Sequence, residues 1–345
     1  MYHRAMNART SQPNPAPVAE AYRQCAEIAG RNIPNLYLAA RFFKSQVIFN
    51  AFCAAYASMR MIDDVVDGLP DREALTDVQR KQLLEKIQSW LGNVRDAFAL
   101  EPAEGPIWLA LSDTFSKFDL PTDPWENLAA AMAMDIEMPY FKDWRTLQKY
   151  MQGASVAPAV VFMHLVLTKL EDDEYICEWA YDEVVEATED LAVFCYWTHI
   201  LRDASQDLEI GENGLVYIPL SELTQFGLTP DDLRRMKADK QATFAFKAMA
   251  EHLFRRARTH EQKGRQHLAR VAQAAEADRV FALNFLIDIY SATLDKIEKI
   301  DFDIFAEDAD LSIDEKRNVL EYTMAEDDVD SDEAMEIFES VFSES

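Results

Sequence analysis

Two aspartate pairs constrain the fold of this chain more than any other feature. Asp63 and Asp67 lie in one segment, and Asp203 and Asp207 lie about 140 residues further on. In each pair, the DxxxD spacing predicts two carboxylates one helical turn apart on one face, about 6 Å from each other. Both pairs are flanked by apolar residues, where uncompensated charge is costly. We therefore expect two helices whose paired carboxylates are held by a cation.

Magnesium is the cation that suits these pairs best. No His or Cys stands between the paired aspartates, and hard oxygen ligands favour Mg²⁺, which takes one or two carboxylates and completes its shell with water and substrate phosphate. An arginine precedes each pair, Arg60 or Arg202, and its guanidinium can bind a diphosphate. One DxxxD is ordinary on a solvated helix face. Two copies, each with its arginine, favour a site for Mg²⁺ and diphosphate, with Mn²⁺ as the alternative metal.

The rest of the sequence has a helical pattern. Apolar residues recur at three- and four-residue spacing, and short Pro, Gly or Asp clusters interrupt them. Only 9 glycines occur in 345 residues, too few for the turns of an all-β protein, and 49% hydrophobic residues suffice for a large core. We expect an all-α, single-domain bundle of about ten or more helices around a central cavity.

Helix boundaries are expected where the pattern is interrupted. The interruptions are residues 68–71, 101–106, 120–124, 209–219 and 227–231. In the last of these, Thr229 can cap a helix and Pro230 suits its first position.

Composition divides the chain into three parts. Residues 1–18 are rich in Pro, Asn, Ser and Gln, which is typical of a flexible leader. Residues 19–310 carry the helical pattern and form the domain. Residues 311–345 form an acidic C-terminal extension, which we expect to be solvated. Of the net charge of −27, −15 falls on residues 301–345, which contain 17 acidic residues and two basic ones.

Charge and hydropathy exclude several classes of function and location. A net charge of −27 argues against nucleic-acid binding. The most apolar segment, residues 156–167, is shorter than the roughly 18 residues of a membrane span. The N-terminal residues lack an apolar signal core, and the four cysteines are scattered without CxxC spacing. We therefore expect a cytoplasmic protein with free thiols.

A basic stretch interrupts the acidic sequence. Residues 252–270 contain five arginines and one lysine. This stretch could form a peripheral contact with an anionic membrane surface, as an enzyme that releases a lipid would need. A solvated helix face is the favoured alternative.

Several segments, in the same order along the chain, match the pattern of one family. They are residues 36–43, the first aspartate motif from Tyr56 to Asp67, the small-residue segment 150–157, the second motif 200–207 with its trailing loop 216–220, and residues 288–298. Together they resemble the squalene/phytoene synthase family, the head-to-head branch of the class I isoprenoid synthases. The resemblance extends over most of the chain, from about residue 22 to residue 305.

This resemblance implies a class I isoprenoid synthase-like helical fold and a Mg²⁺-dependent 1′–1 condensation of two prenyl diphosphates, farnesyl or geranylgeranyl. Diphosphate is released, and NADPH is needed only if the product is squalene. Carried over by position, the metal ligands are Asp63, Asp67, Asp203 and Asp207. The substrate-binding residues are Tyr56, Arg60, Asp64, His199, Arg202 and Tyr290. The catalytic residues are Tyr150, Tyr217 and Arg202. Asp135 is expected to be either a further acidic group at the cavity mouth or a solvated aspartate.

The chain also departs from the family pattern. His199 stands where the family usually has Asn, and Tyr196 where Gln is common. Leu215 replaces an Arg, and acidic residues occupy the region of residues 304–308, where a basic residue is expected. The metal ligands are thus intact while several diphosphate-binding groups are missing. Metal-dependent ionisation is therefore better supported than the use of two substrates.

Three functions follow from these observations. The first is synthesis of a squalene- or phytoene-type product. The second is a divergent class I prenyltransferase or terpene cyclase that uses a single prenyl diphosphate. The third is a non-catalytic relative that acts as an assembly or lipid-binding protein through the basic stretch or the acidic tail. The sequence pattern leaves the oligomeric state open.

Overall fold

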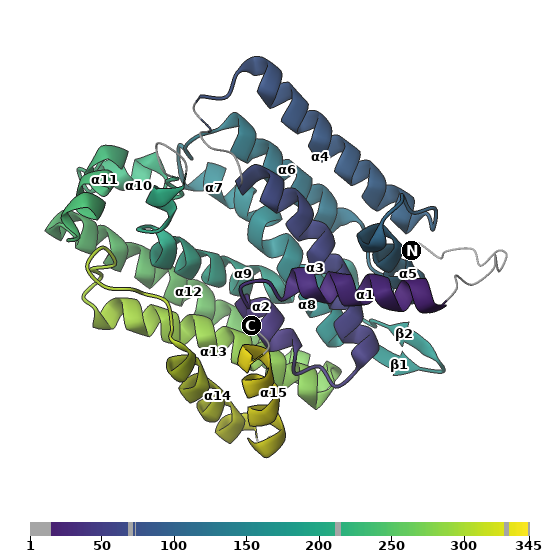
Figure 1. The fold of residues 1–345 in the computed structure, drawn as a ribbon. Helices are drawn as coiled ribbons and strands as arrows, with labels where there is room; N and C mark the ends of the chain where they lie inside the picture. Colours follow the sequence, from purple (N-terminus) through teal and green to yellow (C-terminus); the bar gives the residue numbers. More distant parts are fainter. Residues whose placement is uncertain (1–14, 68–71, 73, 211–214, 328–330, 344–345) are drawn as a thin grey trace.

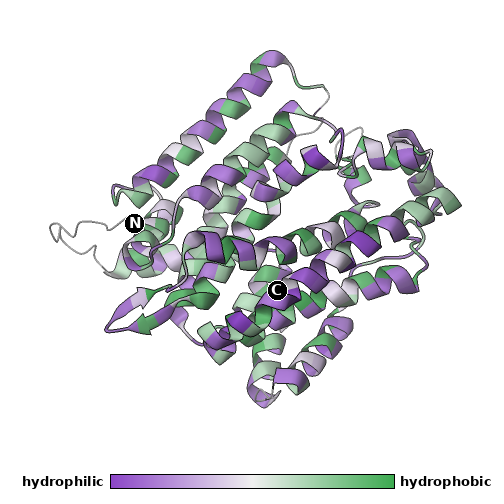
Figure 2. Ribbon diagram, turned by 180° about the vertical axis from the view of Figure 1, so that it is seen from behind, coloured by the Kyte–Doolittle hydropathy of each residue, from purple (hydrophilic) through white to green (hydrophobic). Residues whose placement is uncertain are grey.

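The computed structural model describes residues 15–67, 72, 74–210, 215–327 and 331–343. These residues form fifteen α-helices, and the only strands among them are β1 (Lys169–Glu171) and β2 (Glu174–Ile176), which pair as a short antiparallel hairpin. The helices pack as a bundle with the hairpin at its edge (Figure 1). The prediction of an all-α fold is confirmed. Along many helices hydrophilic and hydrophobic residues alternate (Figure 2), as expected where one face packs on a core.

The first half of the chain forms one side of the bundle. Its helices are α1 (Pro15–Ala29), α2 (Asn35–Ala40), α3 (Gln46–Asp67), α4 (Asp77–Phe98), α5 (Pro106–Lys117), α6 (Asp123–Glu137), α7 (Trp144–Met151) and α8 (Ala157–Leu167). α3 packs against α1, α5 and α8, while α4 lies on the outside and contacts α5 and α6 (Figure 1).

The second half of the chain forms the other side. Its helices are α9 (Tyr181–Asp203), the 3₁₀ helix η2 (Asp207–Glu209), α10 (Leu220–Gln225), α11 (Pro230–Asp239), α12 (Phe244–Ala274), α13 (Ala277–Lys299), α14 (Ile313–Asp327) and α15 (Ser331–Ser343). The closest pairing is between α9 and α12. A Cβ atom added to Gly264 of α12 would lie 2.6 Å from Leu191 Cδ2 of α9, so only glycine permits this approach.

The predicted helix boundaries agree with the structure wherever it describes them. α5 begins at Pro106 and α6 at Asp123, within the interruptions read from the sequence. Thr229 accepts a hydrogen bond from the Asp232 amide (3.3 Å) and donates its own amide to the Asp232 carboxylate (2.9 Å), so it caps α11 as predicted. The interruption at residues 68–71 lies outside the described residues.

The flexible leader was predicted too long. Residues 15–18 form the first turn of α1, with Val18 and Ala21 buried in the core. Proline is tolerated in the first turn of a helix because the amides there have no intrahelical partner. Prolines in this segment are therefore as compatible with the start of a helix as with a loop. Residues 1–14 lie outside the described residues.

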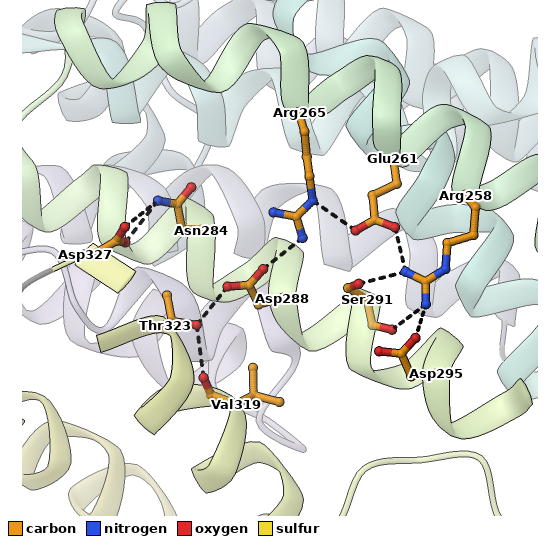
Figure 3. Close-up of polar contacts among 10 residues, drawn as sticks. All are labelled: Arg258, Glu261, Arg265, Asn284, Asp288, Ser291, Asp295, Val319, Thr323 and Asp327. Carbon is orange, nitrogen blue, oxygen red and sulfur yellow. Dashed lines mark hydrogen bonds and ion pairs between the residues drawn. The ribbon is translucent and has the colours of Figure 1, made fainter. Parts of the chain in front are cut away.

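The acidic residues expected to form a solvated tail instead form two packed helices. α14 lies along α13, and its Leu320, Thr323 and Met324 are buried. Thr323 donates a hydrogen bond to the Asp288 carboxylate of α13 (2.9 Å; Figure 3). In α15, Phe338 is fully buried. The acidic side chains occupy the outer faces, so a strong charge did not prevent the inner faces from packing.

A helical segment crosses the middle of the bundle. It consists of α7, the π-helix η1 (Gln152–Val156) and α8, and it is long and apolar enough to cross a membrane. Because 72% of its most apolar window is buried inside the protein, it has the character of a core helix. A Cβ atom added to Gly153 would lie 2.1 Å from the backbone oxygen of Asn127 in α6. The small residue thus brings the two backbones into direct contact.

The basic stretch at residues 252–270 is largely neutralised within the fold. Each of its five arginines forms an ion pair with a carboxylate of the described residues. Arg265 binds Asp288 of α13 (2.8 Å), and Arg258 binds Glu261 of its own helix (2.7 Å; Figure 3). The ion pair between Arg265 and Asp288 connects α12 to α13. They leave little free positive charge for an anionic membrane surface.

The buried imidazole of His164 generates a prediction about pH. The side chain is 6% exposed, its Nδ1 has no hydrogen-bond partner in the part of the chain that the structure describes, and burial lowers its pKa to about 4 from 6.5. Because the folded-state pKa is depressed, the unfolded chain binds protons more tightly. The free energy of unfolding is then fully present above about pH 6.5 and falls as the pH drops towards 4.

Between pH 7 and pH 5 we expect His164 alone to remove about 2 kcal/mol from the free energy of unfolding. Urea unfolding of the wild type and of His164→Met at both pH values measures this effect. The variant should lose less stability than the wild type over the same interval, and equal losses would contradict the prediction.

Candidate functional site

A cavity of about 640 Å³ lies between the two halves of the bundle. Side chains of α3, η1, α8, α9 and α13 line it, together with the segment that follows α13. Its apolar lining includes Leu128, Phe162, Met163, Leu191, Leu283 and Ile287. Its charged lining consists of Arg60, Asp63, Arg202, Asp207, Asp310 and Lys316, with His199 beside them. The cavity can therefore accept a molecule that has both an apolar part and an anionic part.

The first aspartate motif lies in the last turns of α3. Arg60 Nη1 is 2.5 Å from Asp63 Oδ2, and Arg60 Nε is 2.6 Å from Asp64 Oδ1. Arg60 and Asp63 line the cavity, whereas the Asp64 side chain is about half exposed. Asp67 is the last residue of α3, and its side chain lies outside the described part of the structure. Arg60 thus balances two carboxylates of its own motif.

The second motif has a similar arrangement. Arg202 binds Asp203 through Nε (2.5 Å) and Nη2 (2.8 Å), and His199 Nε2 lies 2.7 Å from Asp203 Oδ2. Burial alone would raise the pKa of Asp203, but these contacts from Arg202 and His199 outweigh it and hold the pKa well below its usual range. Asp203 therefore remains a carboxylate at neutral pH.

The two aspartates of the second motif do not lie on one continuous helix, contrary to the prediction. α9 ends at Asp203, a turn follows, and Asp207 begins η2. The Asp207 backbone oxygen accepts a hydrogen bond from the Leu215 amide (2.7 Å), which fixes the start of the loop that returns to the cavity. Asp207 lines the cavity, while Asp203 is buried beside it.

The carboxylates present suit a magnesium ion that the substrate completes. Across the described ranges, no three carboxylate, imidazole or thiol groups converge as a preformed metal site; the side chain of Asp67 is not among them. Asp63 and Asp207 reach the cavity from separate helices. Mg²⁺ commonly uses one or two carboxylates and takes its remaining oxygens from water and phosphate. The all-oxygen donor set therefore fits this metal.

Tyr56 and Tyr290 place two phenols between the motifs. Burial raises the pKa of Tyr56 to about 12, with Arg60 acting in the opposite direction. Burial also raises the pKa of Tyr290, and its phenol experiences the charges of Arg202 and Asp203 and the neighbouring Tyr56. Both residues line the cavity. Both therefore stay protonated at neutral pH and can donate an O–H to an anion.

Tyr150 and Tyr217 belong to a buried polar cluster. Tyr150 donates a hydrogen bond to Asp135 Oδ2 (2.8 Å), Arg72 Nη1 donates to Asp135 Oδ1 (2.5 Å), and Arg72 Nη2 lies 3.3 Å from the Tyr217 hydroxyl. The rings of Tyr150 and Tyr217 are 6.0 Å apart, and both line the cavity. Asp135 is only 1% exposed, so the expectation that it lies at the cavity mouth was wrong. It positions Tyr150 from behind the cavity wall.

Sequence reasoning missed three charged residues of this region. Arg72 lies next to an interruption of the helical pattern. Its partner Asp135 is 63 positions away, so no local sequence pattern indicates that the two residues pair. Asp310 was predicted as the last residue of the domain without a role and Lys316 as part of the acidic extension, yet both line the cavity. Lys316 is one of only two basic residues among positions 301–345, which is the one signal that could have drawn attention to it.

An all-α bundle with acidic motifs from two helices at a partly apolar cavity defines the class of helical isoprenoid synthases. Comparisons with known proteins agree with this class. A family profile described as squalene/phytoene synthase matches residues 31–317. A phytoene synthase from Arthrospira platensis is 26% identical over 298 residues, which cover 84% of this chain and 88% of that protein.

Two solved structures show the same fold. A dehydrosqualene synthase in complex with ligand has a TM-score of 0.70 at 19% identity, over 90% of this chain and 97% of that one. Squalene synthase HpnC from Alicyclobacillus acidocaldarius has a TM-score of 0.67 at 20% identity, over 84% of this chain and 97% of that one. The chain belongs to the squalene/phytoene synthase family, and it is a prenyltransferase.

The buried ion pair of Arg72 and Asp135, behind Tyr150 and Tyr217, predicts a large effect on stability. Arg72 is 6% exposed and Asp135 1%, and removing one partner of a buried ion pair typically costs about 3–5 kcal/mol. We expect Arg72→Met to lower the free energy of unfolding by about that amount in urea unfolding. The matched control is Arg95→Met, whose exposed pair with Glu126 should contribute less than about 1 kcal/mol. Similar losses in both variants would contradict this account of the cluster.

Proposed function

We propose that this enzyme condenses two prenyl diphosphates head to head through a 1′–1 bond and releases diphosphate. The observation that carries the proposal is one cavity that joins a long apolar lining to arginines, aspartates and phenols from both aspartate motifs. The similarity to phytoene synthases supports geranylgeranyl diphosphate and a phytoene-type C40 product as the first choice. Farnesyl diphosphate and a squalene-type C30 product are the alternative, for which NADPH would be the reductant.

The anionic end of the substrate is the part that the charged lining recognises. Asp63, Asp67, Asp203 and Asp207 would hold Mg²⁺, and the bound metal would neutralise the diphosphate and make it a better leaving group. In this structure Arg60 and Arg202 each bind a motif aspartate. With those carboxylates committed to the metal, Arg60 and Arg202 would be available to bind the diphosphate oxygens.

Two phenols complete the binding of the leaving group. Tyr56 and Tyr290 remain protonated because burial raises the pKa of both, so each can donate an O–H to a departing oxygen. When the allylic C–O bond breaks, its electron pair leaves with the diphosphate, and the hydrocarbon becomes a cation. Neutral donors stabilise the leaving group without adding a base next to that cation.

The carbocation requires a pocket without water. The apolar side chains of α8, α9 and α13 exclude solvent from the tail region. Tyr150 and Tyr217 present aromatic rings to the cavity, and the hydrogen bond to Asp135 fixes the Tyr150 phenol. These rings are placed to stabilise the cation electrostatically while the new carbon–carbon bond forms. Loss of a proton then closes a cyclopropylcarbinyl diphosphate, and its own diphosphate leaves with the C–O electron pair to give a second cation. Loss of a further proton gives a phytoene-type product, and hydride addition from NADPH gives a squalene-type product.

One observation favours a second candidate function. Leu215 lines the cavity where the family pattern has an arginine, and Asp310 lines it close to the region where a basic residue was expected. Fewer cations would reduce the binding of a second diphosphate. A divergent prenyltransferase or terpene cyclase that uses one prenyl diphosphate is the function that fits this change.

The proposal is tested by product analysis. Purified protein is incubated with Mg²⁺ and either geranylgeranyl or farnesyl diphosphate, with and without NADPH, and the extracted lipids are identified by mass spectrometry. We expect a C40 or C30 hydrocarbon with a 1′–1 linkage. A shorter alcohol or a cyclic hydrocarbon would establish the second candidate. Intact substrate under every condition, with a folded protein, would contradict both and favour the non-catalytic relative.

Loss of a proposed metal ligand should abolish turnover without unfolding the protein. We expect Asp207→Ala to reduce kcat by about 10²-fold or more, because charge stabilisation of the leaving group is lost. Asp182→Ala, at an exposed position in the first turn of α9, is the matched control and should retain activity. Steady-state kinetics and the melting temperature are measured together, and full activity of the Asp207 variant would refute its assignment.

A further inference from the structure

The segment that follows α13, residues 301–316, lines the charged region of the cavity through Asp310 and Lys316. We call this segment the C-terminal strap. Lys247 of α12 binds Asp301 (2.9 Å), and Asp303 accepts a hydrogen bond from the Ala242 amide (2.8 Å). Phe302 and Phe305 are buried against α12. The strap is therefore anchored in the core.

Asp310 of the strap competes for the arginine of the second motif. Its Oδ1 lies 3.1 Å from Arg202 Nε, the same atom that binds Asp203 Oδ1 at 2.5 Å. Lys296 Nζ holds the Asp310 backbone oxygen and the Glu315 carboxylate, which fixes the strap at this point. Arg202 is thus shared between two carboxylates, one of which belongs to its own motif and one to the strap.

Lys316 lies next to this pair and has no bound anion. It occupies the first turn of α14 and lines the cavity. Its backbone amide donates to the Ser312 backbone oxygen (2.9 Å), but its ammonium group forms no hydrogen bond or ion pair with any residue that the structure describes. Burial and the charge of Arg202 lower its pKa, while Asp310 acts in the opposite direction. An ammonium group in such a position costs free energy unless an anion accompanies it.

The position of Lys316 is fixed by contacts nearer the C-terminal end of α14. Thr323 donates to the Asp288 carboxylate, which also binds Arg265 of α12 (2.8 Å; Figure 3). Asn284 of α13 donates to the carboxylate of Asp327 (3.0 Å) near the end of α14 (Figure 3). α14 is therefore held on α13 along its length, and its first turn presents Lys316 to the cavity in a defined place.

We infer that the C-terminal strap completes the anion site: Lys316 binds the diphosphate, and Asp310 is the carboxylate that the diphosphate displaces from Arg202. In the free enzyme Asp310 stands in for a phosphate oxygen on Arg202. On binding, the diphosphate bridges Arg202 and Lys316, and Asp310 turns to solvent, to which its side chain is already 47% exposed. This inference rests on the proposed function, because it assigns residues to the diphosphate of that reaction.

Removal of Asp310 should have opposite effects on diphosphate binding, depending on whether this carboxylate competes for Arg202 or binds a metal. If Asp310 were a metal ligand, its removal would weaken the binding of diphosphate with Mg²⁺. If Asp310 competes with the diphosphate for Arg202, its removal strengthens that binding, both with and without the metal. Removal of Lys316 weakens binding in either case, and an arginine at that position should restore it because it keeps the charge.

The experiment measures the affinity of the full-length protein for inorganic diphosphate by calorimetry, with and without Mg²⁺. We expect Asp310→Asn to bind about fivefold tighter than the wild type and Lys316→Met about tenfold weaker. Lys316→Arg should bind within about threefold of the wild type. Glu307→Gln, an exposed position in the strap, removes the same charge without reaching the cavity and should leave the affinity unchanged.

Each outcome bears on the inference. Weaker binding by Asp310→Asn, or unchanged binding by Lys316→Met in a folded variant, would overturn it. An equal gain in Glu307→Gln and Asp310→Asn would also overturn it, because the effect would then reflect net charge alone. Melting temperatures establish that the variants are folded. Failure of the proposed function appears separately, as a wild type that binds diphosphate and yields no coupled hydrocarbon.

Discussion

The ion pair between Arg202 and Asp203 is the interaction on which the charged part of this cavity depends. Asp203 sits at the buried end of α9, where burial alone would raise the pKa of its carboxyl group. Arg202 and His199 counteract this rise from the same helix. His199, which stands where the family pattern has an asparagine, contributes its share through Nε2, 2.7 Å from Asp203 Oδ2.

Both motif arginines are already paired with carboxylates. Arg60 binds Asp63 and Asp64, and Arg202 binds Asp203 and Asp310. Under the proposed function, a diphosphate would have to displace carboxylates from these two arginines, and a divalent metal held by the motif aspartates would favour that exchange. Metal and substrate binding would then be coupled, since each would remove the partner that otherwise opposes the other.

The sequence predicts much of this architecture where the signal is local, although the helix break between Asp203 and Asp207 and the early start of α1 were missed. The helical pattern, the cap at Thr229 and the Arg60 motif are all properties of short segments, and the structure contains them. Pairing over long separations leaves no such signal. Arg72 and Asp135 meet only because α6 and the segment before α4 are brought together in the bundle. Their partnership, and the orientation of Tyr150 that follows from it, required the structure.

The C-terminal helices show a second limit, which is set by composition. Averaged over residues 311–345, the charge is typical of a solvated tail, but α14 needs only Leu320, Thr323 and Met324 on one face to pack on α13. The average charge of these residues therefore does not reveal the buried face of α14.

The same packing decides the chemistry of the cavity. Near residues 304–308, where the family pattern has a basic residue, the chain has acidic ones, and Lys316 of the next helix lines the cavity. A comparison of motifs position by position records one basic group as missing and does not register this lysine, because α14 brings it to the cavity from further along the chain.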